Sequence, residues 1–156
     1  MKTPILIIDN IRSAHNVGSI FRTADAAGIQ MIYLCGTTPD PTDRFGRQRN
    51  DIAKVALGAE KTIEWEHVDN TIDVVEKLKR DGCQTIAIEQ SPGSVDYKKI
   101  TPEKNVAFVV GNEVGGVSSD VLGAVDTVAE ISMAGNKESL NVAVATGVAL
   151  FRLLDK

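Results

Sequence analysis

The sequence predicts one α/β domain, residues 1–156, built on a mostly parallel six-stranded sheet with helices on both faces. Short apolar runs alternate along the chain with segments of helical periodicity, which is the pattern of parallel α/β proteins. The length of 156 residues suits one domain, and the contents of 43% hydrophobic and 24% charged residues are close to globular averages. No internal repeat, linker or low-complexity tract interrupts this order.

The first half of the chain is expected to contain three strands and two helices. Residues 5–8 are an unbroken run of isoleucine and leucine, which is typical of a buried strand. Apolar side chains recur with helical spacing over residues 16–27, and a glycine follows as the helix stop. Residues 31–35 and 62–65 are the next strands, and residues 52–57 form a short helix between them.

The second half continues the alternation. A helix is expected over residues 71–80, strands over 85–88, 106–110 and 127–131, and a last helix over 140–154, which is rich in valine and alanine. Ligands of parallel sheets bind beyond the carboxyl ends of the strands. The loops after the first, fourth, fifth and sixth predicted strands are therefore the places where a site is expected.

Charge and cysteine content exclude several classes of protein. With 17 basic and 21 acidic residues the net charge is −4, which argues against a protein that coats nucleic acid through a broad basic face. Neither Cys35 nor Cys83 lies in a CxxC motif or near a histidine cluster, so neither a disulfide scaffold nor a metal site is indicated. No apolar run is long enough to span a membrane, and we expect a protein of the reducing cytoplasm.

Three segments at the expected strand ends carry residues suited to chemistry. After the first strand, Asn16 is a plausible helix N-cap, and Arg22 can project its guanidinium to a phosphate or carboxylate. After the fifth strand, Glu113 stands between glycines at the exit of a buried strand, where a charge needs a partner. Before the last helix, Ser139 is near the cap position, and Asn141 falls just inside the helix, where asparagine lowers helix propensity. Singly, each segment also fits an ordinary turn or helix start.

Several common motifs are absent. No GxGxxG follows the first strand, so an ordinary dinucleotide or class I methyltransferase loop is not indicated. Neither a P-loop nor a serine nucleophile elbow occurs in the sequence.

Together, the three segments resemble the SpoU/TrmH family of RNA 2′-O-ribose methyltransferases, within the SPOUT superfamily, from Ile5 to Leu154. Residues 16–24 (NVGSIFRTA) resemble the motif NxGxxxRTA, residues 111–116 (GNEVGG) resemble GNExxG, and residues 131–142 resemble IxMxG…SLNV. Their order along the chain makes the resemblance specific. The third motif departs from many relatives, because serine at position 132 replaces a proline and alanine at position 143 replaces a frequent serine.

The resemblance implies a fold, a cofactor and a partner. The C-terminal segment would form a deep trefoil knot, which is a rare exception to ordinary topology. S-adenosylmethionine would bind there in a bent shape, and the chain would form a homodimer whose site takes its arginine from the partner subunit. The residues implied in cofactor binding are Glu89, Gln90, Gly111, Ile131, Met133 and Leu140.

The resemblance also implies catalytic roles. Arg22 would act on the ribose 2′-hydroxyl or its adjacent phosphate, and Asn16 would orient Arg22. Because a guanidinium stays charged at neutral pH, electrostatic activation is favoured over proton removal by Arg22. Glu113, Ser139 and Asn141 would hold the substrate and the knot loops, and no metal is implied.

A basic cluster follows the second predicted strand. Residues 43–54 carry four basic and two acidic side chains, a local excess of positive charge in a chain of net charge −4. Arg44, Arg47 and Arg49, with Arg12 near the first motif, are the candidate RNA-binding residues, and Phe45 could stack on a base. The alternative for this cluster is a solvated polar loop.

Three functions stay open. The leading hypothesis is an S-adenosylmethionine-dependent enzyme that methylates a ribose 2′-hydroxyl of tRNA or rRNA. The alternatives are a catalytically inactive SPOUT-like protein that binds cofactor or RNA, and an ordinary nucleotide-binding domain. Because we expect no separate RNA-binding domain, RNA recognition should use a local patch that dimerisation completes.

Overall fold

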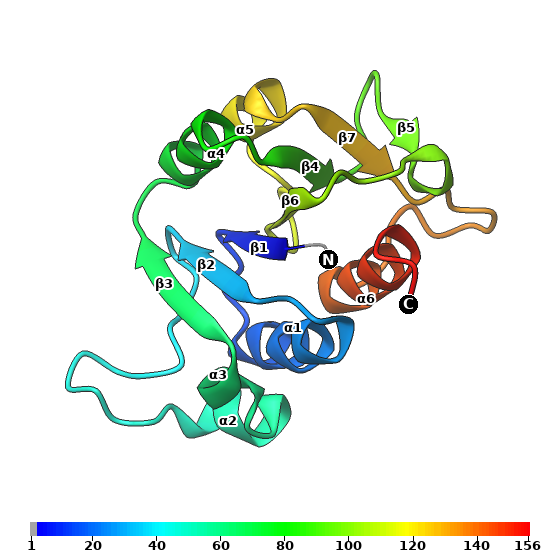
Figure 1. The fold of residues 1–156 in the computed structure, drawn as a ribbon. Coiled ribbons are helices and arrows are strands. Elements are labelled where there is room, and N and C mark those ends of the chain that lie inside the picture. The colour runs from blue at the N-terminus through cyan, green and yellow to red at the C-terminus, as the bar shows by residue number, and fades with distance from the viewer. Residues whose placement is uncertain (1–2) are drawn as a thin grey trace.

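The computed structural model describes residues 3–156, which form a seven-stranded sheet with helices on both faces (Figure 1). The strand order is β3-β2-β1-β6-β4-β7-β5, and every neighbouring pair is parallel. The strands are β1 (Thr3–Asp9), β2 (Met31–Cys35), β3 (Glu64–Val68), β4 (Gln84–Ile88), β5 (Val95–Asp96), β6 (Asn105–Gly111) and β7 (Thr127–Glu130). The helices are α1 (Ala14–Ala27), α2 (Asn50–Ala56), α3 (Ala59–Thr62), α4 (Thr71–Arg80), α5 (Ser119–Ala124) and α6 (Val142–Leu153), with a 3₁₀ helix η1 (Tyr97–Lys99).

The parallel α/β architecture is confirmed, but the prediction of six strands was wrong, because the sheet has seven. The missed strand, β5, is two residues long and lies at the sheet edge, where Val95 and Asp96 pair with Ala129 and Glu130 of β7. Two residues are too few to show a hydrophobic pattern. This strand forms because it pairs with the exposed edge of β7. Such pairing depends on tertiary structure and cannot be predicted from a local sequence pattern.

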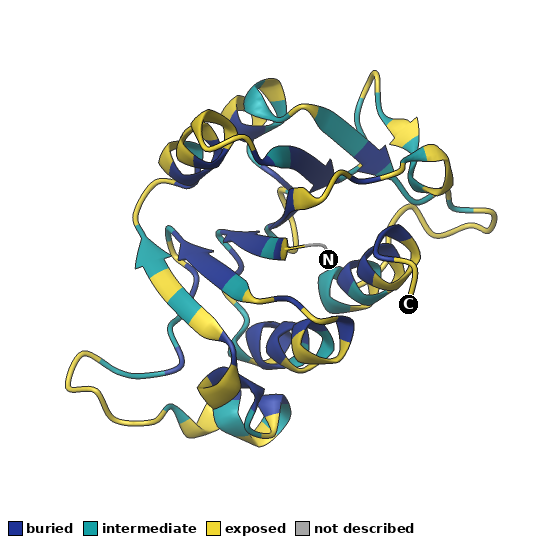
Figure 2. Ribbon diagram, in the orientation of Figure 1, coloured by how far each residue is buried: buried dark blue, intermediate teal, exposed yellow. Residues whose placement is uncertain are grey.

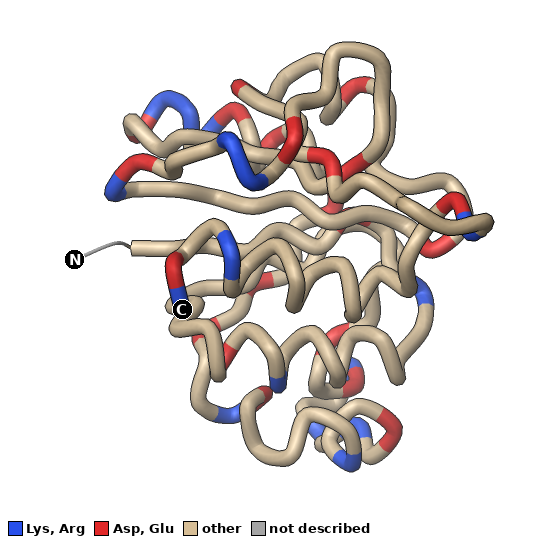
Figure 3. The backbone as a smooth tube through the Cα atoms, turned by 90° about the vertical axis from the view of Figure 1, so that its right-hand side faces the viewer, with Lys and Arg blue, Asp and Glu red and all other residues tan. Residues whose placement is uncertain are grey.

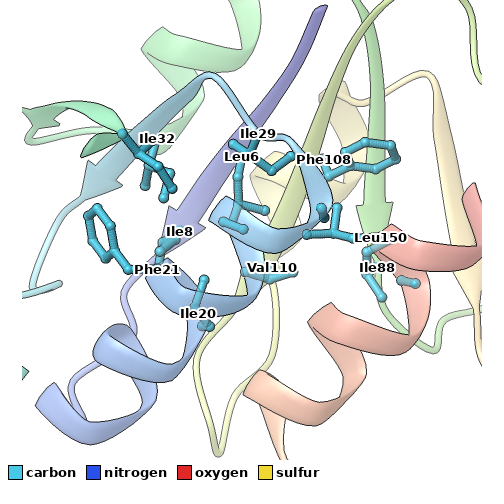
Figure 4. Packing of buried hydrophobic residues seen from close by; sticks show 14 of the residues in the cluster. Leu6, Ile8, Ile20, Phe21, Ile29, Ile32, Ile88, Phe108, Val110 and Leu150 are labelled. Carbon is cyan, nitrogen blue, oxygen red and sulfur yellow. The ribbon is translucent and has the colours of Figure 1, made fainter. Parts of the chain in front are cut away.

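Two apolar cores lie on the two faces of the sheet. Leu6 and Ile8 of β1 belong to the larger core, and Ile7 between them belongs to the smaller one, as the alternation of a strand requires. Phe21 of α1 and Leu150 of α6 pack into the larger core (Figure 4). The core therefore brings the C-terminal helix beside the helix that carries the first motif.

Both cysteines are buried and free. Burial raises the pKa of Cys35 to about 12 and the pKa of Cys83 to about 11, so neither thiol is ionised at neutral pH. Within residues 3–156, no helix is long and apolar enough to cross a membrane.

One edge of the sheet collects the loops that were expected to carry the site. The strands β1, β6, β4 and β7 are consecutive neighbours, with Asp9 in register with Gly111 and Ile88 in register with Ala129. Their carboxyl ends therefore open onto the same side. The strands β1, β4 and β6 are largely buried and β7 is mostly half-buried, whereas much of the connecting loops is exposed (Figure 2).

Candidate functional site

A pocket opens at this edge, between the loops after β4, β6 and β7 and the start of α6. All six residues predicted to bind the cofactor line it, together with Glu113 and Ser139 of the predicted catalytic set. Its volume of about 220 Å³ lies below the roughly 300–1,000 Å³ of whole ligand pockets. A larger ligand would place one part inside and leave the rest at the mouth.

Asn112 shapes the loop that forms one side of the pocket, residues 111–118. Its Oδ1 accepts the backbone N–H groups of Val114 and Gly115 at 2.9 and 3.0 Å, and its backbone exchanges two hydrogen bonds with Gly116. Its Nδ2 donates to the carbonyl of Asn10 at 2.7 Å. A single side chain thus closes the 111–118 loop and ties it to the end of β1.

Glu89, at the end of β4, holds the other end of the same loop. Its Oε2 accepts the N–H of Val117 at 3.0 Å, and its Oε1 accepts the N–H of Gln90 at 2.9 Å. Gly116 has φ +68°, and a Cβ there would lie 2.1 Å from Glu89 Oε2. The backbone angle therefore favours glycine, and a Cβ would force the Glu89 carboxylate to move.

Asp9, the last residue of β1, was not among the predicted site residues but is a further anchor of the 111–118 loop. It is 1% exposed, and its Oδ2 accepts both the N–H and the hydroxyl of Ser118 at 3.0 Å. Its Oδ1 accepts the hydroxyl of Thr71 at 2.5 Å and the amide of Asn10 at 3.2 Å. The signal in the sequence was an acidic residue at the end of a fully apolar strand, because such a charge needs donors.

Hydrogen bonds connect the three motifs to one another. Glu113 accepts the backbone N–H groups of Arg12 and Ser13 at 3.3 and 3.0 Å and the amide of Asn16 at 3.4 Å. Asn16 Oδ1 accepts the Asn141 amide at 3.3 Å. Burial opposes ionisation of Glu113, but its own backbone N–H, that of Ser13 and the Asn16 amide outweigh this and lower the pKa of Glu113. The carboxylate therefore acts here as an ionised anchor.

The structure corrects the cap positions of two helices. Ser13, rather than Asn16, caps α1 and accepts the Asn16 N–H at 3.1 Å. Asn141, rather than Ser139, caps α6 and accepts the N–H of Ala143 at 2.9 Å. The side chain of Asn16 is therefore available to bond elsewhere, and its Oδ1 accepts the Nδ2 of Asn141, 125 residues away in the chain. Asn141 thus both caps α6 and links the third motif to the first.

Two predicted arginines lie away from the pocket lining. Arg22 is exposed on α1, six residues and about 9 Å along the helix from Asn16, and its guanidinium has no hydrogen bond or ion pair within residues 3–156. The Asn16 side chain bonds to Glu113 and Asn141, and not to Arg22 as expected from the resemblance. Arg12 is exposed beside Glu113. Within one chain, the guanidinium of Arg22 is thus not brought into the pocket.

The other three predicted RNA-binding arginines lie in the loop between β2 and α2. The Cζ atoms of Arg44 and Arg47 lie 4.8 and 5.0 Å from the centre of the Phe45 ring. Arg49 forms an ion pair of 2.7 Å with Asp51. Elsewhere Lys and Arg are interspersed with Asp and Glu along the chain, which agrees with a local rather than a broad basic surface (Figure 3).

Comparisons with known proteins agree with this arrangement. The model of the SpoU rRNA Methylase family matches residues 3–151. A tRNA (guanosine(18)-2′-O)-methyltransferase of Aquifex aeolicus is 33% identical over 96% of this chain and 68% of that enzyme. The 23S rRNA (guanosine-2′-O-)-methyltransferase RlmB of Pseudomonas aeruginosa is 33% identical over 96% of this chain and 58% of that enzyme.

Solved structures show the same relationship. An rRNA methyltransferase of Sinorhizobium meliloti, solved with AdoMet bound, superposes with a TM-score of 0.87 and 34% identity over 97% of this chain and 55% of that chain. This chain thus spans little more than half of two of these three relatives. The family match covers nearly the whole length, and the fold lines one pocket with the second and third motifs and bonds both to Asn16 of the first. These findings lead to one conclusion: this chain belongs to the SpoU rRNA methylase family.

Proposed function

We propose that this chain is an S-adenosylmethionine-dependent enzyme that methylates a ribose 2′-hydroxyl of tRNA or rRNA. The observation that carries the proposal is the chain of hydrogen bonds from Glu113 through Asn16 to Asn141, which joins the pocket to the helix that bears Arg22. Relatives named as tRNA and rRNA 2′-O-methyltransferases support the reaction and the class of substrate. The AdoMet-bound neighbour supports the cofactor.

The pocket fits such a cofactor by its chemistry. Ile131, Met133 and Leu140 supply apolar walls, and the backbone near Gly111 supplies polar groups, so an adenine can be held without a charged partner. Glu89 would keep the 111–118 loop in shape, since its Oε2 accepts the N–H of Val117 while its Oε1 is held by the N–H of Gln90. When bound, the cofactor supplies a methyl group activated by its positively charged sulfur.

The residues of this chain would then activate the hydroxyl. A ribose 2′-hydroxyl is a weak nucleophile at neutral pH, and its oxygen gains negative charge as the proton leaves. A guanidinium beside that oxygen, or beside the neighbouring phosphate, stabilises the developing charge, which is the role proposed for Arg22. The hydrogen bonds among Asn16, Glu113 and Asn141 would fix the positions of α1, the 111–118 loop and α6 relative to one another. Ser139 would contact the substrate at the pocket mouth.

We further propose a homodimer in which Arg22 serves the pocket of the partner subunit. Its support is the exposed position of Arg22 on α1 and an exposed apolar stripe on the neighbouring α6. Val144, Val148 and Phe151 recur at helical spacing along α6 and are 38–52% exposed. A stripe of this kind is typical of a surface that another chain covers.

The trefoil knot and a cytoplasmic location are also proposals, as is the view that these residues act as one catalytic domain. Two observations support the knot. The strand β6 inserts between β1 and β4 instead of following β5. The last helix packs against the segment that joins β4 to β6, where Arg152 donates to the carbonyl of Lys98 at 3.0 Å.

The test is methyl transfer from labelled S-adenosylmethionine to purified tRNA and rRNA. We expect Arg22→Ala to lower the rate by at least about 100-fold, because removing one transition-state donor typically costs that much. Its affinity for the cofactor, measured by calorimetry, should stay within about twofold of wild type. Arg80→Ala, on the exposed end of α4, is the matched control and should keep full activity.

Two outcomes would contradict the proposal in different ways. An Arg22→Ala variant as active as wild type would remove the assigned role of Arg22. A wild-type chain that binds S-adenosylmethionine but transfers no methyl group to either RNA would favour the non-catalytic alternative.

A further inference from the structure

Residues 42–48 form a small hairpin, here called the finger, between β2 and α2. In Figure 1 it is the cyan loop that projects away from the sheet at the lower left. Thr42 and Gln48 pair across its base, and Asp43 donates its N–H to the carbonyl of Arg47 at 2.8 Å. Gly46, at φ +76°, turns the chain at the tip. The finger is thus an ordered element and not a loose connection.

Asp43 organises the finger from within. Its Oδ1 accepts the N–H groups of Phe45 and Arg47 at 2.8 and 3.0 Å, and its Oδ2 accepts Nε of Arg47 at 2.9 Å. The backbone N–H of Arg47 is the largest influence on the pKa of Asp43. Burial opposes it, but with the Phe45 N–H and the Arg47 guanidinium the net effect is a lowered pKa. The finger therefore keeps its shape at neutral pH without help from the core, and little order has to be gained on binding.

Phe45 is the exposed tip of this element. Its side chain is 66% exposed, which is unusual for a phenylalanine and contributes little to folding. The guanidinium groups of Arg44 and Arg47 lie within 5.0 Å of its ring centre, at cation–π distance. An exposed ring flanked by planar cations offers stacking surfaces that suit a nucleobase.

The charges near the finger are largely balanced by local partners. Arg47 pairs with Asp43 at 2.9 Å, and Arg49 pairs with Asp51 at 2.7 Å. Among residues 3–156, Arg44 contacts the Phe45 ring but forms no ion pair, so it is the one arginine of the three whose charge is not already paired with a carboxylate. The arrangement therefore favours stacking over the binding of several phosphates, and stacking requires a base that is not already paired and stacked in a duplex.

We propose that the finger holds an unpaired nucleotide of the RNA substrate, with Phe45 stacked on its base and Arg44 at its phosphate. The inference rests on the proposed function, and it names the part of the substrate that this surface recognises. It also narrows the expectation from the sequence, in which Arg12, Arg44, Arg47 and Arg49 were the RNA-binding residues and Phe45 could stack on a base.

The test compares two labelled RNAs by fluorescence anisotropy: a hairpin with an unpaired loop and a blunt duplex of equal length. We expect Phe45→Ala to weaken binding of the hairpin roughly tenfold, because one base–aromatic stack is worth about that much, and to leave duplex binding unchanged. Phe45→Trp should restore hairpin binding. Arg44→Ala should reduce the slope of affinity against salt by about one phosphate contact.

A matched control separates the finger from general surface effects. Leu57 is 64% exposed and lies outside the finger, so Leu57→Ala removes a comparably exposed apolar side chain and should leave binding of both RNAs unchanged. Binding of S-adenosylmethionine verifies that each variant is folded.

The failure of this inference can be told apart from the failure of the proposed function. Hairpin binding that is unaffected by Phe45→Ala, or hairpin and duplex binding that fall equally, would overturn the stacking role alone. A wild-type chain that binds neither RNA would overturn the RNA substrate and, with it, this inference.

Discussion

The 111–118 loop and the finger are both short, glycine-containing loops, yet different parts of the molecule hold them. The 111–118 loop is bonded to Asn10, Asp9 and Glu89, which lie at the ends of two other strands. The finger is held by Asp43, one of its own residues. The first loop therefore depends on the whole sheet, whereas the second can change without disturbing the fold.

The largest expected difference between the two loops is in cofactor affinity, when one glycine of each loop is replaced by alanine. Gly116 and Gly46 both have positive φ, so each change should cost about 1–2 kcal/mol of unfolding free energy. Gly116→Ala should also break the Glu89 bond to the loop, because its Cβ would overlap the carboxylate, and should weaken cofactor binding at least about tenfold. Gly46→Ala meets no atom within 4 Å and should leave that affinity unchanged. Urea unfolding and calorimetry measure the two effects, and equal losses of cofactor affinity would contradict the comparison.

A smaller effect on cofactor affinity should distinguish the two hydroxyl groups that donate to Asp9, those of Ser118 and Thr71. Ser118→Ala removes a hydrogen bond on the loop side, and Thr71→Val removes one on the α4 side. Both should lower the unfolding free energy by about 1–2 kcal/mol. Ser118→Ala alone should raise the dissociation constant of S-adenosylmethionine severalfold. If Thr71→Val weakened cofactor binding as much, Asp9 would be a support of the fold in general and not an anchor of this loop.

Asn141 tests the link from the 111–118 loop to α6. Asn141→Ala loses both the helix cap and the bond to Asn16, so we expect about 1 kcal/mol lower stability together with reduced methyl transfer. Asn141→Ser restores the cap but not the bond. Recovery of stability without recovery of the transfer rate would support the link, and recovery of both would leave Asn141 with a capping role only.

The smallest expected effect is on the free energy of unfolding at acid pH. The folded pKa of Glu113 lies below its ordinary value of 4.5, so ionised Glu113 stabilises the fold above that pH, and this contribution is lost as pH falls through the lowered pKa. We expect Glu113→Gln to flatten the acid side of the stability profile and to weaken cofactor binding at neutral pH. Asp43→Asn should flatten the profile in the same direction, since the pKa of Asp43 is also lowered, without changing cofactor binding. Chemical unfolding at a series of pH values measures both.

Much of the architecture could be predicted because its signals are local. The run of apolar residues in β1 and the helical spacing in α1 are properties of neighbouring residues, and both elements occur near the expected positions. The strand β5 and the helix α5 were missed because pairing and packing with distant residues stabilise them.

The site could be predicted only where a motif marked it. The six expected cofactor residues surround one pocket, but the role of Asp9 depends on Ser118, which lies 109 residues away in the chain. Similarly, the basic cluster could be predicted from its composition. The ion pair between Arg47 and Asp43, which reduces the unpaired positive charge of the cluster, could be found only from the structure.

The chemical nature of the product tests the central claim most directly. RNA incubated with the chain and labelled S-adenosylmethionine is hydrolysed in alkali, which cleaves next to every free 2′-hydroxyl. We expect the label in alkali-resistant dinucleotides, because a methylated 2′-oxygen cannot attack the neighbouring phosphate. Label found only in mononucleotides would place the methyl group on a base and contradict the proposed reaction.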